Sequence, residues 1–544
     1  MNQCINLTIG QQLKNTAVQY PNKAGAIFPA ESLRMTYKEI EEKSNIVAKA
    51  LIALGINKGA HIGIWGPNTS NWMLLLFGAT KIGAVIVPLI TSYKFKELQY
   101  IVNQSEIEFL FSMTQFRETD CELITKKFLN NKNEIDKSTY PSLKNVYYID
   151  ENPNHLFGDW NDFLNLASNV SDEELKDYAS LIKPDDLYSI QYTSGTTSLP
   201  KGAMLTQFGA LNTSKACADI LHLNSTDICC VPLPFSHCFG NILTIMAGII
   251  LACPIVYIDN FTPLKVMNTI QNEKCTVVVG VPTMFIAMLN HPSFHEFDFT
   301  SLDTCGLGGS LCPVSIMEQI SNAFQLENIS IGYGLSETAS LCTLTEITEA
   351  QYYKFHTVGK AIPGIQIKIV DPITLNEVPV NTQGELLVKG YNVMNGYYNK
   401  PEENQNAFTK DGWFRTGDIA TVDENGFYKI VGRYKDIIIR GGENISPGEV
   451  EKTILTLDNV KDVQIIAVPD STFVDEIAAF IITNDGNEMD ASFIKEYVKT
   501  NLASYKRPKY IAFVSEFPTT ESGKVQKFKL KEYAIELWNL NSDT

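Results

Sequence analysis

The sequence is marked first by what it lacks. None of its 11 cysteines belongs to a C-x-x-C pair, and no basic stretch followed by an apolar run opens the chain. Unpatterned cysteines predict free thiols in a reducing compartment, and the missing leader pattern predicts a cytoplasmic location. The net charge of −17, from 61 acidic against 44 basic residues, argues against general binding to nucleic acid, which favours a basic surface.

Long hydrophobic runs are also scarce. The most membrane-like segment, residues 241–258, has about the minimum length that can span a bilayer, but Asn241, Thr244 and Pro254 interrupt it. The residue before a proline is biased away from helix. We therefore expect a buried helix that ends before Pro254, a strand after it, and no membrane span.

Short β-branched runs alternate with helical patterns through most of the chain. The segments 61–66, 84–89, 276–282 and 329–334 are unbroken apolar runs, as buried parallel strands are. Residues 71–83, between the first two, have the apolar spacing of a helix. This alternation predicts an α/β fold with mixed parallel sheets and helices.

The pattern of apolar and polar residues changes after about residue 365. Alternating strands joined by turns predict a small, antiparallel, barrel-like part, followed by a small α/β unit. Ser446, Pro447 and Glu449 predict a helix start with a capping box. Because 544 residues exceed one compact core, we expect a large N-terminal domain over residues 1–433 and a small, mobile α/β C-terminal domain over residues 434–544.

The stretch Gln191–Leu205, QYTSGTTSLPKGAML, has a composition suited to holding phosphate. It does not match the common G-x-x-x-x-G-K-[ST] loop, because Pro200 stands where the second glycine should be and Gly202 follows Lys201. Hydroxyls and backbone N–H groups in a turn can still surround phosphate oxygens, and Lys201 adds a positive charge. On composition alone, a flexible polar loop is an equally good interpretation.

Three further segments each carry a charged residue at a position where it could bind a ligand. Glu337, in Gly332–Ser340, could hold Mg²⁺, which prefers one or two carboxylates plus substrate phosphates. Asp418 lies in a predicted turn where its carboxylate could accept both hydroxyls of a ribose, and Lys524 follows a Ser-Gly turn near the C-terminus. Taken singly, these residues are equally typical of a helix cap, a turn aspartate and a solvated lysine.

Their order carries more information than any one of them. A Ser/Thr/Gly loop, then Y-G-x-x-E-T, W-x-x-T-G-D, G-R-x-K-D and S-G-K resembles the acyl-adenylate-forming, or AMP-binding, superfamily. That family includes acyl-CoA synthetases, adenylation domains of peptide synthetases and luciferases. The resemblance covers nearly the whole chain, and five ordered motifs make it specific. A non-catalytic nucleotide-binding protein is disfavoured because the residues that the chemistry needs are all present.

The resemblance implies a role for each matching residue. Lys524, Thr193, Glu337 and His237 would be the catalytic residues, with Glu337 as the Mg²⁺ ligand and Lys524 between the acid and the α-phosphate. The ATP and AMP contacts would come from Thr193, Ser194, Gly195, Thr196, Thr197, Lys201, Gly309, Ser310, Tyr333, Gly334, Thr338, Asp418 and Arg433. Cations are needed because two anions must approach each other.

The family also implies a domain rotation between two half-reactions. Lys435 would be the hinge, and Gly441 and Gly442 would line a tunnel for the thiol of coenzyme A. Arg440, just before this pair, is a candidate contact for a nucleotide phosphate of coenzyme A. These residues belong to the second half-reaction, after Lys524 has left the site.

The segment PLPFSHCFGN resembles the family's P-x-x-H-x-x-G motif. Phe235, His237, Gly308 and Leu335 would line the acyl pocket. No aspartate follows Phe235, which disfavours a substrate with a free α-amino group, and the apolar run after His237 suits an aliphatic or aryl acid.

The sequence therefore predicts an ATP- and Mg²⁺-dependent ligase that activates a medium- or long-chain fatty acid and passes it to coenzyme A. Two alternatives share the chemistry, namely an aryl-CoA ligase and a fatty-acyl-adenylate ligase that loads an acyl carrier protein. A luciferase-like oxygenase is less well supported.

Overall fold

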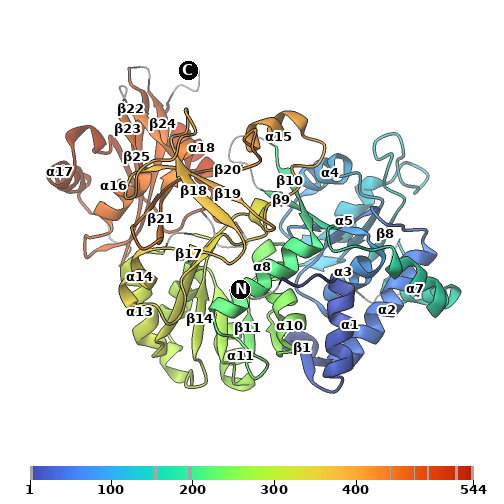
Figure 1. Ribbon diagram of the computed structural model, residues 1–544. Coiled ribbons are helices and arrows are strands. Elements are labelled where there is room, and N and C mark those ends of the chain that lie inside the picture. The colour runs from blue at the N-terminus through green and yellow to red at the C-terminus, as the bar shows by residue number, and fades with distance from the viewer. Residues whose placement is uncertain are drawn as a thin grey trace. The chain divides into compact units, whose positions relative to one another are not determined.

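The computed structural model describes residues 4–150, 157–193, 199–310, 312–440, 443–470, 472–484, 486, 489–520 and 525–540, apart from the side chains of Asn444 and Val474. Within these ranges the chain forms two compact units (Figure 1). The first unit is built from residues 4–193, 199–366 and 388–414, and the second from residues 367–387 and 415–540. The expected boundary at residue 433, between a core domain and a mobile domain, stays a prediction.

A nine-stranded sheet carries much of the first unit. Its order is β17–β16–β15–β14–β13–β11–β12–β1–β2. The strands from β1 to β15 in this order run parallel, and antiparallel strands close both edges. The bounds are β1 Ala24–Phe28, β2 Leu33–Thr36, β11 Cys229–Val231, β12 Ile255–Tyr257, β13 Val277–Gly280, β14 Thr304–Leu307, β15 Asn328–Tyr333, β16 Thr343–Leu344 and β17 Lys360–Ala361.

A six-stranded sheet, in the order β10–β9–β4–β3–β5–β8, forms the other layer of strands in this unit. Its strands run parallel except for β10, which pairs antiparallel with β9. The bounds are β3 His61–Trp65, β4 Val85–Leu89, β5 Phe109–Ser112, β8 Asn145–Tyr148, β9 Leu187–Thr193 and β10 Lys201–Thr206. The two-stranded β6 (Gln115–Phe116) and β7 (Thr119–Asp120) stand apart.

Helices cover the sheets of the first unit, and α1, α2 and α3 pack against one another (Figure 1). The α3 helix begins at the Thr69 cap and ends where Gly83 takes a left-handed φ of 74°, which glycine adopts without strain. The helices are α1 Ile9–Gln19, α2 Tyr37–Ala53, α3 Ser70–Ile82, α4 Phe95–Gln104, α5 Cys121–Thr125, α6 Trp160–Asn165, α7 Asp172–Ser180, α8 Gln207–Ile220, α9 Cys238–Gly240, α10 Met246–Leu251, α11 Pro263–Glu273, α12 Pro282–Leu289, α13 Val314–Phe324, α14 Gln351–His356 and α15 Pro401–Ala407.

The second unit holds two sheets of its own. One has the order β18–β19–β20–β21, and the other joins β23, β22, β25, β24 and β26. Their bounds are β18 Gln366–Val370, β19 Gly384–Lys389, β20 Phe414–Val422, β21 Tyr428–Arg433, β22 Ile438–Arg440, β23 Glu443–Ile445, β24 Val460–Asp470, β25 Val474–Thr483 and β26 Tyr510–Phe513, with helices α16 Pro447–Ile454, α17 Ala491–Asn501 and α18 Lys527–Leu537. The mixed α/β fold class is confirmed.

The predicted strands at residues 61–66, 84–89, 276–282 and 329–334 are confirmed as β3, β4, β13 and β15. The membrane-like segment is also as predicted, since α10 ends at Leu251 and β12 follows Pro254. No helix in the described part of the chain is long and apolar enough to cross a membrane. All eleven cysteines are free.

The predicted capping box at the start of α16 is wrong. The helix does begin at Pro447, but the Ser446 side chain makes no cap hydrogen bond. Its hydroxyl instead donates to the Val431 carbonyl at 3.4 Å, and the Glu449 carboxylate pairs with Lys506 at 2.6 Å. Contacts distant in sequence therefore replace the local pattern that Ser446 and Glu449 suggested.

Candidate active site

The nine-stranded sheet gathers several predicted site residues at one edge. Gly308, Gly309 and Ser310 follow β14, and Tyr333 ends the neighbouring parallel strand β15. The segment that contains His237 leaves β11, which belongs to the same parallel set. Because the carboxyl ends of parallel strands meet at one edge, these residues lie where ligands bind in open α/β sheets.

The two ends of the predicted phosphate segment face each other. Thr193 and Lys201 are cross-strand partners in the β9–β10 pair, and the Thr193 hydroxyl donates to the Lys201 carbonyl at 3.4 Å. Ser194, Gly195, Thr196 and Thr197 lie outside the described residues, so their predicted phosphate contacts stay predictions. What the strands provide is a pair of fixed ends, with the Lys201 ammonium at one of them.

Glu337 lies in η6 (Ser336–Thr338), a short helix that follows β15 and packs against β9 and β10. Its Oε1 accepts a 2.8 Å hydrogen bond from the hydroxyl of Tyr397. Burial, reinforced by the Glu337 charge, raises the pKa of Tyr397 well above its usual range. Tyr397 therefore stays protonated and donates to Glu337 at any physiological pH.

The surroundings of Glu337 fit a magnesium ion that arrives with a nucleotide. Its side chain is half-buried, and no described residue donates a hydrogen bond to its Oε2. Among the described residues no group of three or more histidine, cysteine or carboxylate side chains could hold a metal alone. Mg²⁺ commonly uses one protein carboxylate together with phosphate oxygens and water, which is the donor set that Glu337 could complete.

The turn around Glu337 is tightly built. Thr338 is fully buried, and its hydroxyl exchanges hydrogen bonds of 3.0 and 3.1 Å with the backbone of Leu335. A Cβ at Gly334 would lie 2.1 Å from the Ser340 carbonyl oxygen, so only glycine fits there. The predicted nucleotide contacts of Gly334 and Thr338 stay predictions, but both residues shape the loop that carries Glu337.

The predicted acyl segment contacts this loop. His237 caps α9 by accepting the Phe239 N–H at 3.1 Å, and the adjacent Cys238 thiol lies 3.6 Å from the Ser336 hydroxyl. Burial by itself raises the pKa of the Cys238 thiol, but His237 and hydrogen bonds with His237 and Ser336 outweigh it, so the pKa is lowered. A π-helical stretch, Asn241–Ile245, follows, a feature that is frequent at functional sites.

The other predicted pocket residues differ in their surroundings. Phe235 is fully buried, with its ring centroid 5.1 Å from that of Trp72 and 4.8 Å from that of Tyr257. A Cβ at Gly308 would come within 3.3 Å of the Phe239 ring, and Leu335 is half-buried. These positions bring Gly308 and the His237 segment together, while Phe235 packs into the core behind them.

Asp418 and Arg433 belong to the second unit. They are cross-strand partners in β20 and β21, and the Arg433 Nε lies 2.7 Å from Asp418 Oδ1. Asp418 is almost completely buried, with 1% of its side chain exposed, whereas 27% of Arg433 is exposed. The arginine thus orients the carboxylate that was predicted to bind ribose, a role that stays a prediction.

The predicted residues of the second half-reaction are only partly described. Lys435 lies exposed in η7 (Tyr434–Asp436), directly after β21. Gly441, Gly442 and Lys524 lie outside the described residues. Arg440 is engaged within its own unit, where its Nη2 pairs with the buried Glu476 at 2.8 Å and its Nη1 donates to the Tyr505 carbonyl at 2.8 Å.

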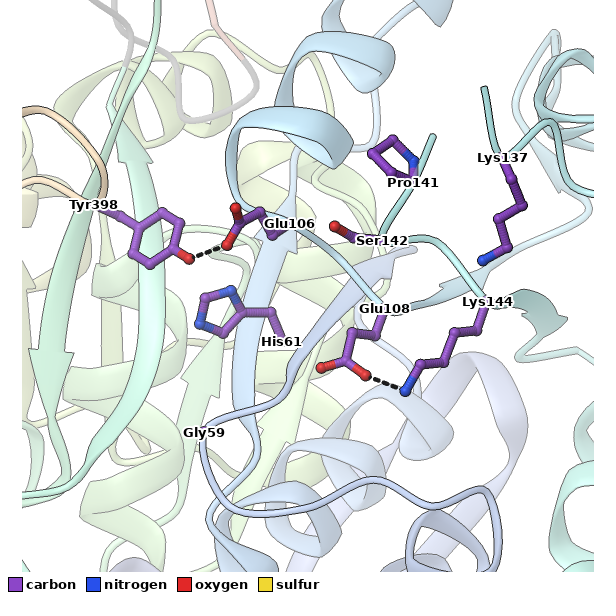
Figure 2. A pocket seen from close by; sticks show the side chains of 9 residues that line it. All are labelled: Gly59, His61, Glu106, Glu108, Lys137, Pro141, Ser142, Lys144 and Tyr398. Carbon is purple, nitrogen blue, oxygen red and sulfur yellow. Dashed lines mark hydrogen bonds and ion pairs between the residues drawn. The ribbon is translucent and has the colours of Figure 1, made fainter. Parts of the chain in front are cut away.

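A hollow of about 540 Å³ opens elsewhere on the first unit (Figure 2). Its charged groups bind one another, with Tyr398 donating to Glu106 at 2.5 Å and Lys144 pairing with Glu108 at 2.5 Å. The His61 Nδ1 lies 2.6 Å from the Ser105 carbonyl and must carry its proton there. None of the predicted site residues lines this hollow, which makes it a poor candidate for the reaction site.

Comparison with known proteins identifies the class. The family model of AMP-binding enzymes matches residues 13–398, and that of the AMP-binding enzyme C-terminal domain matches residues 449–524. The chain therefore belongs to the AMP-binding enzyme family, as its motifs predicted.

Named relatives narrow this class. The chain is 39% identical over 547 residues to YngI of Bacillus subtilis, which carries the name of an acyl-CoA synthetase, with 100% of both chains covered. It is 33% identical to the mitochondrial medium-chain acyl-CoA ligase ACSF2 of Danio rerio, covering 96% of this chain and 88% of that one. These relatives confirm the prediction of an AMP-forming acid–thiol ligase of the acyl-CoA synthetase kind.

Solved structures agree on the fold. The anthranilate CoA ligase AuaEII, in complex with anthranoyl-AMP, aligns with a TM-score of 0.87 at 25% identity and covers 99% of each chain. A fatty acyl CoA synthetase of Mycobacterium tuberculosis aligns with a TM-score of 0.74 at 26% identity, covering 97% of this chain and 99% of that one.

One contact of Glu337 was missed by sequence reasoning. Tyr397 lies in the segment NGYYNKP, between β19 and α15, 60 residues from the carboxylate that it contacts. The Gly-Tyr-Tyr turn before a proline marks it as a loop, but no local pattern says which side chain the loop touches.

Proposed function

We propose that this protein activates a medium- or long-chain fatty acid with Mg²⁺-ATP and transfers the acyl group to coenzyme A. The observation that carries the proposal is the joint match of both family domains and of the medium-chain acyl-CoA ligase over 96% of the chain. The arrangement of Thr193, Lys201 and Glu337 around the ends of one loop supports it.

In the first half-reaction, a carboxylate oxygen of the acid attacks the α-phosphorus of ATP. A bond from oxygen to phosphorus forms, the bond to the β,γ-phosphates breaks, and pyrophosphate leaves. Lys201 and the residues after Thr193 would hold the departing phosphates, and Lys524 would stand between the acid and the α-phosphate. Mg²⁺ held by Glu337 would supply further positive charge against the phosphate oxygens. Gly309, Ser310 and Tyr333 would hold adenine, and Asp418 would hold ribose.

In the second half-reaction, the thiol sulfur of coenzyme A attacks the acyl carbonyl carbon. The thioester bond forms, the bond from the carbonyl carbon to the AMP oxygen breaks, and the thiol proton goes to solvent or a nearby base. Rotation at Lys435 would first remove Lys524 and bring Gly441 and Gly442 to the acyl group. The division of the chain near residue 433 is part of this proposal.

A fatty acid is favoured over an aryl acid by the identity of the named relatives. The relatives named as medium-chain acyl-CoA ligases match at 32–33% identity over nearly the whole chain, whereas the anthranilate ligase matches at 25%. The helical segment after His237, from Cys238 to Leu251, contains no charged residue, which suits an aliphatic acid and an unsubstituted aryl acid equally well.

Pyrophosphate release over a panel of acids tests the substrate class. The panel contains straight-chain acids of increasing length together with benzoate and anthranilate. Each buried methylene contributes about 0.8 kcal/mol, so kcat/KM is expected to rise about fourfold per methylene until the pocket is full. A preference for an aryl acid, with no rise along the straight-chain series, would contradict the fatty-acid assignment.

The acceptor is tested on the acid that the panel selects. We expect mass detection to find acyl-CoA when coenzyme A is supplied. Acylation of a carrier protein's phosphopantetheine without formation of acyl-CoA would favour the carrier-loading alternative. The cytoplasmic location stays a prediction, and fractionation of cells that express the chain would test it.

A further inference from the structure

Tyr397 contacts two residues that are central to the proposed reaction. Its hydroxyl donates to Glu337 Oε1 at 2.8 Å, and the Lys201 ammonium lies 5.3 Å from the centroid of its ring. The second distance is within the range of a cation–π interaction. One side chain thus contacts both the carboxylate predicted to hold Mg²⁺ and the lysine predicted to hold phosphate.

The backbone of Tyr397 is fixed on both sides. Its N–H donates to Asn404 Oδ1 at 2.7 Å, and its carbonyl accepts from Asn404 Nδ2 at 2.9 Å. An isolated bridge pairs it with Ala203 of β10, the strand that begins at Lys201. Because both of its backbone groups are bound, Tyr397 can hold its partners in place instead of following them.

The same segment is also tied to the Glu337 backbone. The Met394 N–H donates to the Glu337 carbonyl at 2.8 Å, and the Tyr398 N–H donates to the Gly202 carbonyl at 2.9 Å. The segment 394–398 therefore links the Glu337 loop to β10 through main-chain bonds. The tyrosine hydroxyl adds the side-chain link that sets where the carboxylate points.

The two charges that Tyr397 contacts do not neutralise each other. Among the described residues no ion pair joins Lys201 to Glu337 or to any other side chain, although both side chains contact the same tyrosine. A direct pair would use a carboxylate oxygen and the ammonium group that a nucleotide and its metal need. A ring face attracts a cation without carrying a net negative charge, and a phenol hydroxyl occupies only one of the two carboxylate oxygens.

We propose that Tyr397 is a positioning residue, which orients Glu337 toward Mg²⁺ and holds Lys201 apart from it, so that both act on the phosphates of ATP. The inference rests on the proposed function, because it assigns Tyr397 a role in binding Mg²⁺-ATP. It goes further by assigning two roles to one side chain. The hydroxyl orients the carboxylate that would bind the metal, and the ring contacts Lys201.

Binding of ATP at graded Mg²⁺ concentrations, measured without acid by protection against thermal unfolding, tests the proposal with no turnover required. Tyr397→Phe removes the hydroxyl and keeps the ring. It is expected to raise the Mg²⁺ concentration for half-maximal ATP binding about tenfold, while ATP affinity at saturating Mg²⁺ stays near that of the wild type. Tyr397→Leu also removes the ring and is expected to weaken ATP binding at saturating Mg²⁺ by about twofold to fivefold.

The adjacent tyrosine provides a matched control. Tyr398→Phe removes a hydroxyl that binds Glu106 at the hollow of Figure 2, so it is expected to leave the Mg²⁺ dependence unchanged. In the background of Glu337→Gln, Tyr397→Phe should have no further effect on Mg²⁺ dependence, because the partner that it positions has lost its charge.

The outcomes separate the inference from the function. If ATP binding by Tyr397→Phe has the same Mg²⁺ dependence as that of the wild type, the inference is wrong and the proposed function is unaffected. The same conclusion follows if Tyr398→Phe shifts the Mg²⁺ dependence as much as Tyr397→Phe does. If ATP binding by the wild-type enzyme does not depend on Mg²⁺, the proposed role of Glu337 is wrong, and so is the inference. If Tyr397→Phe also lowers the unfolding midpoint, the Glu337→Gln background decides. The inference then stands only if adding Tyr397→Phe to Glu337→Gln causes no further shift in Mg²⁺ dependence.

Discussion

Lys201 stands directly across from Thr193 in the antiparallel pair of β9 and β10. The Ser/Thr/Gly segment between them is closed by two hydrogen-bonded strands, so its two ends are held at a fixed separation. Residues on paired strands are positioned more precisely than residues on loops. The Lys201 charge is therefore carried by a paired strand. The loop that precedes it lies outside the described residues.

Lys201→Met is expected to slow acid-dependent pyrophosphate release by about a hundredfold or more, because a preorganised cation on the leaving phosphates is lost. The main-chain bridge to Thr193 is unaffected, so the unfolding midpoint should hardly change. Kinetics of pyrophosphate release, with the midpoint as a control, measure both. An activity loss that is matched by a loss of stability would contradict a role on the phosphates.

Lys524→Ala is expected to abolish adenylate formation far more than it slows thioester formation from a supplied acyl-adenylate. In the proposed mechanism, Lys524 acts only while two anions approach each other in the first half-reaction. Single-turnover assays of the two half-reactions measure this difference.

The hinge variant Lys435→Pro should show the opposite pattern, with the thioester step impaired. Equal losses in both steps for either variant would refute the domain rotation.

Arg440→Met is expected to lower the stability of the second unit by roughly 3 kcal/mol, because it leaves the buried Glu476 without its cation. The double variant with Glu476→Gln should recover part of that loss. Thermal unfolding measures both variants. If Arg440 instead binds a phosphate of coenzyme A, Arg440→Met will raise the KM for coenzyme A with no loss of stability.

Asp462→Asn is expected to stabilise the second unit at neutral pH. Burial raises the pKa of Asp462 from 3.8 to about 6, against the hydrogen bond that it accepts from the Val463 N–H. Between these two pKa values the folded carboxyl keeps a proton that the unfolded one has released, so stability falls as pH rises through this window. The cost of the buried charge is fully present above about pH 6 and absent below 3.8.

The variant removes that charge and should gain about 3 kcal/mol at neutral pH, with only a small gain near pH 4. Unfolding midpoints at the two pH values measure it. Asp458→Asn, at an exposed position nearby, serves as the control. An equal gain at both pH values would show that burial of the charge is not the cause.

The sequence predicted those parts of the fold that local patterns determine. Unbroken β-branched runs correctly indicated β3 and β13, because buried parallel strands need no polar face. Pro447 correctly indicated the start of α16, since proline suits the first turn of a helix. The capping box failed because Val431 and Lys506 compete for Ser446 and Glu449, and neither competitor is near in sequence.

The same limit applies to the site. Ordered motifs predicted Glu337, Asp418 and Lys201 as site residues through resemblance to a family, yet they do not show what orients each of these side chains. Tyr397 reaches Glu337 through a loop 60 residues away, and Arg433 reaches Asp418 through strand pairing. Such partners are set by tertiary packing, which one sequence does not reveal.

The most direct test of the central claim follows the oxygen atoms of the acid. The enzyme is given ATP, coenzyme A and a fatty acid whose carboxylate carries heavy oxygen, and the AMP is analysed by mass. Attack of the carboxylate on the α-phosphorus, followed by thiol attack on the acyl carbon, predicts AMP with one heavy oxygen, with pyrophosphate unlabelled. Unlabelled AMP, or ADP with phosphate as the products, would contradict activation through an acyl-adenylate.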